Sequence, residues 1–296
     1  MQGEPRARTE TSHQEMNEMQ VGMLTARHRN DTMDTVVNFA VEAGFDCLEV
    51  EIRPGCAHLS VDMDAAQAAD IVAQVRDAGL EISQMSCFVD ISAADEATRA
   101  ANQDAMRAAV ELASANGVQN VGCLAGLPCG TMSRDETIDQ IAAPFYNELC
   151  PIAADHGVRF AMENWFATNI MHLGHFERIF DAVPHGNFGL NFDPSHLYHQ
   201  QIDHLRAVEV FSERIFHSHA KDTEIVRHKL EWFGNRDERT WWRYVIPGYG
   251  ELDWGVYIAR LRDNGFDGTL SIEHEDRAMG REEGFIKGCN FLRIYA

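Results

Sequence analysis

Eight short β-type runs alternate with amphipathic helical patterns, and this order constrains the fold more than any other feature of the sequence. Eight βα units without a linker or a break in composition favour a single (β/α)₈ barrel, an α/β fold of the TIM type. A doubly wound open sheet is the alternative, but its usual glycine-rich phosphate loop is missing after the first run. The runs are Gln20–Leu24, Cys47–Ile52, Glu81–Phe88, Asn120–Gly126, Arg159–Trp165, Phe188–Asp193, Ile215–Lys221 and Thr269–Glu275.

We expect the barrel to occupy residues 19–296 as one domain. Residues 1–18 are polar and lack a hydrophobic period, which predicts a disordered N-terminal extension. Inside the barrel, Asp64 is placed to begin a helix, and Gly44 and Gly79 follow helical patterns as left-handed stops. The spacing of these signals agrees with short loops between strands and helices.

Composition excludes several classes of function. A net charge of -21, from 25 basic and 46 acidic residues, argues against nucleic acid as a partner, because such a surface repels phosphate backbones. The chain has no apolar run of membrane-spanning length and no signal-peptide pattern, so we expect neither a membrane span nor export. The seven scattered cysteines form no CxxC pair and indicate reduced thiols in a cytoplasmic protein.

Polar residues gather at the ends of the last four runs, where barrel enzymes have their active sites. Glu163, Asp193, His219 and Glu273 come from four consecutive strands. Three carboxylates at one rim would repel one another without a counter-charge, and a divalent cation resolves that conflict. Three carboxylates with one imidazole suit Mn²⁺, Mg²⁺ or Co²⁺, and Zn²⁺ stays open.

Each of these residues also has a simpler interpretation. Asp193 precedes Pro194 and Ser195, a pattern typical of a helix cap. A single buried glutamate often caps a helix or pairs with arginine, and a single buried histidine often serves only the core. These interpretations weaken together, because four neighbouring strands deliver the residues to the same rim.

The strand-end motifs resemble those of the sugar phosphate isomerase/epimerase family in the xylose isomerase-like TIM-barrel superfamily. They are MEN at Glu163, DPSH at Asp193, HAKD at His219 and SIEHED around Glu273. That superfamily includes ketose 3-epimerases, inosose dehydratases and endonuclease IV. The resemblance extends from Gln20 to the end of the chain and implies an enzyme with a xylose isomerase-like barrel.

The resemblance implies that Glu163, Asp193, His219 and Glu273 hold one divalent metal ion, with Mn²⁺ as the first choice. In the ketose epimerases the two glutamates also exchange the substrate proton, so Glu163 and Glu273 are the predicted catalytic residues. These enzymes carry an arginine six positions after the metal histidine, where this chain has Ile225. That difference argues against a free ketose as the substrate.

Five further side chains are candidates for binding the substrate. Two of them follow from the family motifs, one is the arginine nearest to position 225, and one stands just past the second strand. The fifth lies in the unusually long connection of residues 222–250, where it could stack on a sugar or merely anchor the connection to the rim. The candidates are His196, Lys221, Arg227, His58 and Trp242.

These residues predict removal of a proton next to a carbonyl through an enediolate, which epimerises or isomerises a small sugar or keto-sugar. Loss of a leaving group instead would give a lyase or dehydratase acting on a keto-sugar, an inosose or a 3-keto-glycoside, as in C-glycoside-cleaving enzymes. An endonuclease IV-like phosphodiesterase is a remote alternative, because no Asp-x-His pair lies between His219 and Glu273. We expect a homo-oligomer, or a hetero-oligomer with a small subunit for a glycoside lyase.

Overall fold

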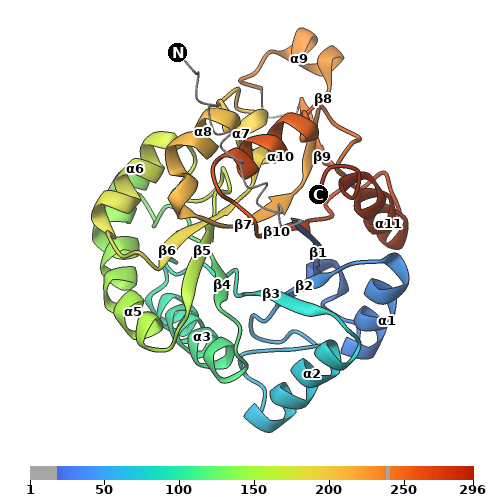
Figure 1. Ribbon diagram of the computed structural model, residues 1–296. Helices are drawn as coiled ribbons and strands as arrows, with labels where there is room; N and C mark the ends of the chain where they lie inside the picture. The colour runs from blue at the N-terminus through green and yellow to red at the C-terminus, as the bar shows by residue number, and fades with distance from the viewer. Residues whose placement is uncertain (1–18, 238–240) are drawn as a thin grey trace, which may run out of the picture.

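Eight parallel strands close into a barrel in the order β1-β10-β7-β6-β5-β4-β3-β2 (Figure 1). The computed structural model describes residues 19–237 and 241–296, so the predicted extension of residues 1–18 lies outside the described residues. All eight predicted runs form barrel strands. They are β1 (Gln20–Leu24), β2 (Cys47–Glu51), β3 (Glu81–Ser86), β4 (Asn120–Cys123), β5 (Arg159–Glu163), β6 (Phe188–Phe192), β7 (Ile215–Ala220) and β10 (Thr269–Ile272).

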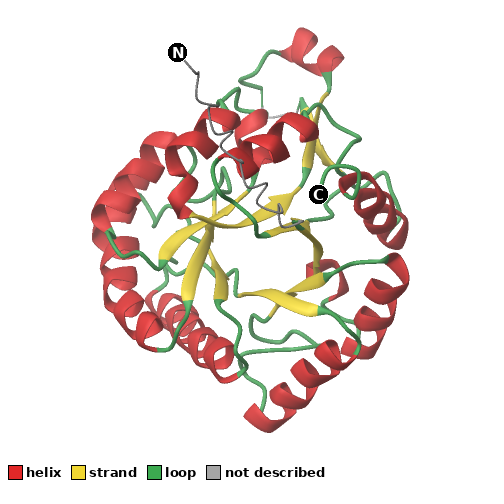
Figure 2. Ribbon diagram, viewed as in Figure 1, coloured by secondary structure: helices red, strands yellow, loops and turns green. Residues whose placement is uncertain are grey.

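A helix follows each barrel strand and packs on the outside of the ring (Figure 2). Local signals set the helix ends: the Asp64 carboxylate accepts from the backbone N–H groups of Ala66 and Gln67, and Gly44 ends the first helix at a φ of 80°. The helices are α1 (Met33–Ala43), α2 (Ala65–Asp77), α3 (Glu96–Ala115), α5 (Ala143–Asp155), α6 (Leu173–Ala182), α8 (His204–Phe211), α10 (Trp254–Asp263) and α11 (Arg281–Leu292).

Short helical turns lie in several of the connections. The helix α7 matters most for the site, because it begins directly behind β6 at the C-terminal rim of the barrel. The short elements are η1 (Thr25–His28), α4 (Arg134–Thr137), η2 (Ile138–Ala142), α7 (Pro194–Tyr198), η3 (Ser212–Arg214) and α9 (Arg227–Phe233). Within the described residues, no helix combines the length and the apolar character that a membrane span requires.

The long connection after β7 is not a plain loop, as the sequence had suggested. It contains an antiparallel pair, β8 (Asp222–Ile225) and β9 (Trp242–Val245), which lies outside the closed barrel beside α9 at the top of Figure 1. We call β8 and β9 the hairpin. Because β8 begins two residues beyond the end of β7, the hairpin rises directly from the rim where the predicted site residues meet.

The buried Asp222 fixes the base of the hairpin. Its carboxylate accepts hydrogen bonds from both sides of the connection, at 2.7–3.1 Å. A Cβ at position 250 would collide with this carboxylate, so a glycine is needed there. The donors are the backbone N–H groups of Thr223, Gly248, Gly250 and Leu252 and the indole of Trp254.

Seven of the eight barrel strands end earlier than the sequence predicted, while β1 ends at Leu24 as predicted. The run expected to continue to Phe88 ends at Ser86, and the run expected to reach Gly126 ends at Cys123. The last residues of these seven runs leave the sheet to begin the βα loops. As a result Asp193, Lys221 and Glu273 each come directly after a strand rather than inside one, while Glu163 is the last residue of β5.

Candidate metal and catalytic site

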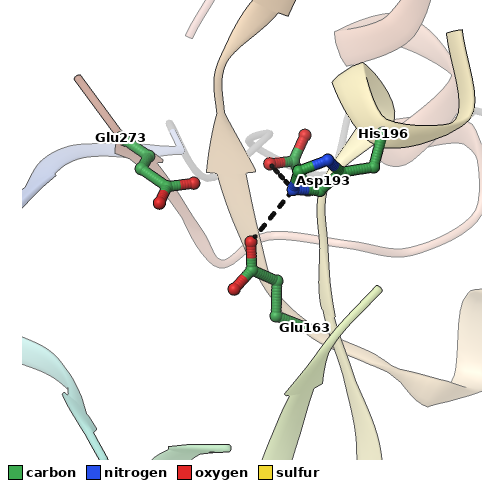
Figure 3. A group of neighbouring side chains, drawn as sticks. All are labelled: Glu163, Asp193, His196 and Glu273. Atoms are coloured by element: carbon green, nitrogen blue, oxygen red, sulfur yellow. Dashed lines mark hydrogen bonds and ion pairs between the residues drawn. The ribbon is translucent and has the colours of Figure 1, made fainter. Parts of the chain in front are cut away.

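Three carboxylates converge at the C-terminal rim, as the sequence predicted. Glu163, Asp193 and Glu273, together called the carboxylate cluster, lie with His196 so that one ligand-type atom from each falls within 4.8 Å of the others (Figure 3). Asp193 is fully buried, and the side chains of Glu163 and Glu273 are 8% and 18% exposed. Charges this close and this poorly hydrated need compensation, which the surrounding side chains supply only in part.

Asp193 serves as a helix cap with one oxygen and faces the cluster with the other. Its Oδ1 accepts from the backbone N–H of Ser195 at 2.8 Å, at the start of α7. Its Oδ2 lies 3.2 Å from the ammonium of Lys221, but within the described residues it receives no hydrogen bond of acceptable geometry. The two interpretations of this residue are therefore compatible, because they use different atoms.

Two imidazoles border the carboxylate cluster. His219 Nδ1 lies 3.4 Å from Glu163 Oε1, 3.8 Å from Asp193 Oδ2 and 3.2 Å from Glu273 Oε2. His196 Nε2 lies 3.2 Å from Glu163 Oε1 and 3.5 Å from Asp193 Oδ2. The sequence predicted a ligand role for His219 and a substrate contact for His196. The structure brings both rings to the same three carboxylates.

Lys221 supplies a positive charge at the same place. Its buried ammonium bonds to Glu273 Oε2 at 2.5 Å and to Glu275 Oε2 at 3.0 Å, and it lies 3.2 Å from His196 Nε2. Burial alone would lower the pKa of Lys221, but Asp193, Glu273 and Glu275 outweigh it and raise that pKa well above its usual range. The lysine is therefore cationic and not a neutral base.

The carboxylates themselves are held in their ionised form. Burial would raise the pKa of Glu273, but the charge of Lys221 prevails and lowers it to about 2. Burial likewise opposes ionisation of Glu163, while the hydrogen bond with His196 and the nearby charges of His219 and Lys221 lower its pKa. Both glutamates can therefore accept a proton at neutral pH.

The donor set fits a divalent cation. Among the buried polar atoms of the described residues, Asp193 Oδ2 and His219 Nδ1 both lack a hydrogen-bond partner, and both face the carboxylate cluster. A buried polar atom without a partner costs free energy, so two of them facing one cluster indicate a ligand that they bind. Carboxylate oxygens and an imidazole nitrogen are suitable donors for Mn²⁺, Mg²⁺, Co²⁺ or Zn²⁺.

A layer of polar side chains lies inside the barrel behind His219. We call it the barrel layer, and its centre is Glu49, a fully buried residue of β2. Glu49 Oε1 accepts from Ser86 Oγ at 2.6 Å and from Gln84 Nε2 at 2.9 Å. Burial opposes its ionisation, but His219 and His217 lower its pKa to about 2. The barrel layer consists of Glu49, Gln84, Ser86, Asn191 and His217.

Sequence reasoning missed Glu49. A signal was present, because an acidic residue stands in the middle of the short buried run Cys-Leu-Glu-Val-Glu. Its alternation places Glu49 on the same face as Cys47 and Glu51. What the run alone does not reveal is the partner across the barrel, since that depends on how the sheet closes.

An aromatic group lies on the other side, behind His196. We define the hairpin cluster as Phe166, His199, Trp242 and Tyr244. The hydroxyl of Tyr244 lies 2.5 Å from His196 Nδ1 and 3.3 Å from His199 Nε2, and Trp242 stacks on His199 at 3.9 Å. Tyr244 belongs to the Trp-Trp-Arg-Tyr run that the sequence offered for stacking on a sugar, but its contact with His196 was not predicted.

The other two candidates lie apart from the cluster. Arg227 pairs with Glu251 at 2.5 Å and lines a surface pocket with Tyr198 and Trp241, which no member of the carboxylate cluster lines. His58 is buried, with Nε2 2.9 Å from the hydroxyl of Thr25. Within the part of the chain that the structure describes, neither residue contacts the carboxylate cluster, so their substrate roles stay predictions.

A pocket of about 270 Å³ opens against the site on the β1 side. Glu273 and Glu275 line it together with three arginines. A cavity of this size has room for a small molecule beside Glu273, the member of the carboxylate cluster that lines it. The arginines are Arg27, Arg29 and Arg277.

The fold and the rim cluster define a class of barrel enzyme, and comparisons with known proteins agree. A family model for the xylose isomerase-like TIM barrel matches residues 37–295, and the chain belongs to that family. The protein YfiH of Bacillus subtilis is 24% identical over 88% of this chain and 94% of its own length. An inosose dehydratase of Clostridium perfringens is 24% identical, but the match spans only 50% of this chain and 51% of that enzyme.

Solved structures show the same fold. The 3-keto-D-glucoside 4-epimerase YcjR of E. coli superposes with a TM-score of 0.74 at 16% identity, over 94% of this chain and 100% of that one. The IolI protein with a bound zinc atom also gives 0.74, at 18% identity, over 94% of this chain and 99% of that one. At these identities the likeness shows the fold alone. Among the sequence relatives named here, the inosose dehydratase has a stated activity, and its half-length match supports an enzymatic role for this chain.

Proposed function

We propose that the chain is a divalent-metal-dependent enzyme that removes a proton next to the carbonyl of a small sugar or keto-sugar and returns it, as an epimerase or isomerase does. The observation that carries this proposal is a pair of buried atoms, Asp193 Oδ2 and His219 Nδ1, that receive no hydrogen bond within the described residues and face two ionised glutamates. That arrangement combines a cation site with two proton acceptors in one buried cluster.

Four residues would hold the ion: Glu163, Asp193, His219 and Glu273. A divalent ion bound there would act as a Lewis acid that stabilises negative charge on the substrate oxygen. Glu163 and Glu273 come from well-separated strands, β5 and β10, so they reach a substrate from different directions. One ionised glutamate takes the proton from carbon and later releases it to solvent, and the other, after taking up a proton from solvent, delivers it to the opposite face.

His196 and Lys221 would orient the substrate. The ring of His196 is held between Tyr244 on one side and Glu163 on the other, so its direction is fixed. The ammonium of Lys221 offsets part of the carboxylate charge and can donate to a substrate hydroxyl. Mn²⁺ is the ion we propose first, followed by Mg²⁺, Co²⁺ and Zn²⁺, because carboxylates predominate among the donors.

A dehydratase or other lyase is the second candidate. The half-length similarity to inosose dehydratases supports it, and the first step would be the same proton removal. The carbanion would then expel a group from the neighbouring carbon instead of regaining the proton. A hetero-oligomer with a small subunit belongs to this candidate, while a homo-oligomer belongs to the first.

Metal analysis and a solvent-exchange assay test the proposal together. We expect about one divalent ion per chain, removable by a chelator, as a single site of this donor set implies. Keto-sugars and inososes incubated in D₂O with Mn²⁺ should gain deuterium next to the carbonyl, and the chelated protein should not incorporate it. An epimeric product supports the first candidate and a dehydrated product the second. A protein that binds no divalent ion and exchanges no proton contradicts both.

A further inference from the structure

We infer that Glu49 is a positioning residue for His219: its carboxylate accepts the Nε2–H of the imidazole and thereby aims the free Nδ1 lone pair at the carboxylate cluster. This inference rests on the proposed function, because it assigns the residue that prepares one of the proposed ligands. Glu49 lies on β2, across the barrel from β7, and it belongs to none of the motifs at the rim.

The geometry gives the two nitrogens of His219 opposite surroundings. Nδ1 faces three carboxylate oxygens at 3.2–3.8 Å, while Nε2 lies 3.2 Å from both oxygens of Glu49. Nε2 forms a hydrogen bond with Glu49 Oε1, whereas Nδ1 forms none of acceptable geometry within the described residues, so a neutral imidazole held by Glu49 carries its proton on Nε2. A neutral imidazole has one N–H, and Nδ1 is then the nitrogen with the lone pair.

Asn191 agrees with this tautomer in one of its two amide orientations. Its Nδ2 lies 2.9 Å from His219 Nε2 and its Oδ1 lies 3.0 Å from His217 Nδ1. The two ends of an amide have nearly the same shape, so the oxygen can also face His219, which gives up the 3.5 Å contact from Asn191 Nδ2 to Glu49 Oε1. In that orientation His219 Nε2–H donates to both acceptors, Asn191 donates to His217, and His217 Nε2–H donates to Ser83 at 3.1 Å.

Glu49 is itself held in place. Ser86 and Gln84 both donate to Oε1, at 2.6 and 2.9 Å, and the side chain is wholly inside the barrel. Barrel interiors are normally filled with branched apolar side chains. A buried carboxylate at this position costs free energy, and the contact with His219 gives it a role beyond packing.

The expected consequence is on metal affinity. A carboxylate behind a ligand imidazole fixes the ring direction and raises its basicity, and loss of such a group typically weakens metal binding 10–100-fold. In this chain Glu49 would act through His219 without touching the ion or the substrate. Its removal should therefore change the affinity for the ion far more than the affinity for substrate at saturating metal.

The test compares variants of two neighbouring glutamates by titrating the metal-free proteins with Mn²⁺ in a calorimeter. Glu49→Gln keeps the shape of the side chain and should weaken Mn²⁺ binding about tenfold, and Glu49→Ala should approach 100-fold. Glu51→Gln is the matched control, because Glu51 is equally buried on β2 but pairs with Arg53 and Arg29 instead of a histidine. Its Mn²⁺ affinity should stay within about twofold of the wild type, outside the range expected for a residue behind a ligand.

A second readout separates positioning from general damage to the fold. Nitrogen-15 spectra of the Zn²⁺-loaded protein report which imidazole nitrogen carries the proton, and His219 should show a protonated Nε2 in the wild type. Glu49→Asp retains a shorter carboxylate and should recover part of the affinity. If Glu49→Ala does not fold, the Gln and Asp variants, checked by thermal unfolding without metal, carry the comparison.

The outcomes distinguish this inference from the proposed function. Wild-type binding with a selective loss in Glu49→Gln supports both. Wild-type binding with an unchanged Glu49→Gln, or with a protonated Nδ1 on His219, overturns the positioning role and leaves the proposed function intact. A wild-type protein that binds neither Mn²⁺ nor Zn²⁺ overturns the proposed function, and the role of Glu49 with it.

Discussion

The two imidazoles at the carboxylate cluster are supported from two different kinds of structure. Behind His219 stands the barrel layer, built from strands of the closed sheet and centred on the fully buried Glu49. Behind His196 stands the hairpin cluster, where Tyr244 and Trp242 come from an antiparallel pair outside the barrel. One imidazole is therefore positioned by the framework of the fold and the other by an added element.

This difference suggests a division of labour. The side chains of the barrel layer are buried and bonded to one another inside the closed sheet, which suits the fixed geometry that a metal site requires. The hairpin lies on a connection between elements, where binding residues commonly sit on a rigid scaffold. Variants behind His219 should accordingly change metal affinity, and variants behind His196 should change how the substrate is handled.

The largest effect is expected where the two regions meet, in the carboxylate cluster itself. Glu273→Gln removes a proton acceptor and should lower the rate of solvent-deuterium exchange about 10²–10⁴-fold at saturating Mn²⁺. Glu51→Gln is the control, because Glu51 is also a buried glutamate at the end of a strand but pairs with Arg53 and Arg29 outside the carboxylate cluster. Unchanged exchange in Glu273→Gln, with the fold intact by circular dichroism, would remove Glu273 from the mechanism.

Tyr244→Phe should separate the two regions most clearly. It keeps the ring but removes the hydroxyl that lies 2.5 Å from His196 Nδ1. Loss of one hydrogen bond at a buried ring should cost about 1–1.5 kcal/mol, or roughly tenfold in kcat/KM. Mn²⁺ affinity measured by calorimetry should not change. A tenfold loss of metal affinity in this variant would show that the hairpin also positions the metal site.

Trp242→Ala tests what the exposed part of the hairpin cluster does. If the indole contacts substrate, KM should rise by about threefold to tenfold while kcat changes little, as for lost uniform binding. Trp242→Phe keeps an aromatic ring over His199 and should show a smaller change. Unchanged kinetics with a lower melting temperature would instead identify Trp242 as an anchor for the hairpin.

The smallest expected effect is a change in the free energy of unfolding with pH. The hairpin cluster and the barrel layer each contribute one neutral histidine to it. Burial lowers the pKa of His199 to about 3 and that of His217 to about 4, from 6.5. Below pH 6.5 the unfolded chain takes up protons that these folded residues do not, so the free energy of unfolding falls as the pH drops towards 4. Urea unfolding of the metal-free protein between pH 7 and 5 measures the slope.

His199→Phe should remove part of that slope and leave the contribution of His217. The substitution keeps an aromatic ring against Trp242, which limits the loss of packing. A slope identical to that of the wild type would mean that His199 is already protonated in the folded protein. The hairpin cluster would then hold a positive charge, while the barrel layer would still hold a neutral histidine.

Much of this molecule could be predicted from local patterns. Alternating β runs and helices specify the barrel. A polar residue at the C-terminal end of a barrel strand lies at the rim, and for this reason Glu163, Asp193 and Glu273 could be predicted to lie together. Glu49 was not predicted, because its role depends on a contact with His219, which lies 170 residues further along the chain. Sequence alternation reports the face of a strand, not its partner across a closed sheet.

The contact between Tyr244 and His196 was not predicted for a different reason. Its strand β9 has only four residues and pairs with β8, which is separated from it by α9 and a further stretch of chain. Such a pairing depends on long-range closure and leaves a weak local signal. The cap formed by Asp193 was visible from the sequence, but only coordinates show that one oxygen caps α7 while the other faces the cluster.

The attachment of the hairpin has an evolutionary consequence. The base of the segment between β7 and α10 is fixed by Asp222, a single side chain that gathers donors from both of its ends. A segment secured in this way can be lengthened, shortened or exchanged as a cassette without disturbing the strands that hold the carboxylates. Descendants of one barrel could in this manner acquire new substrates while inheriting the same proton chemistry.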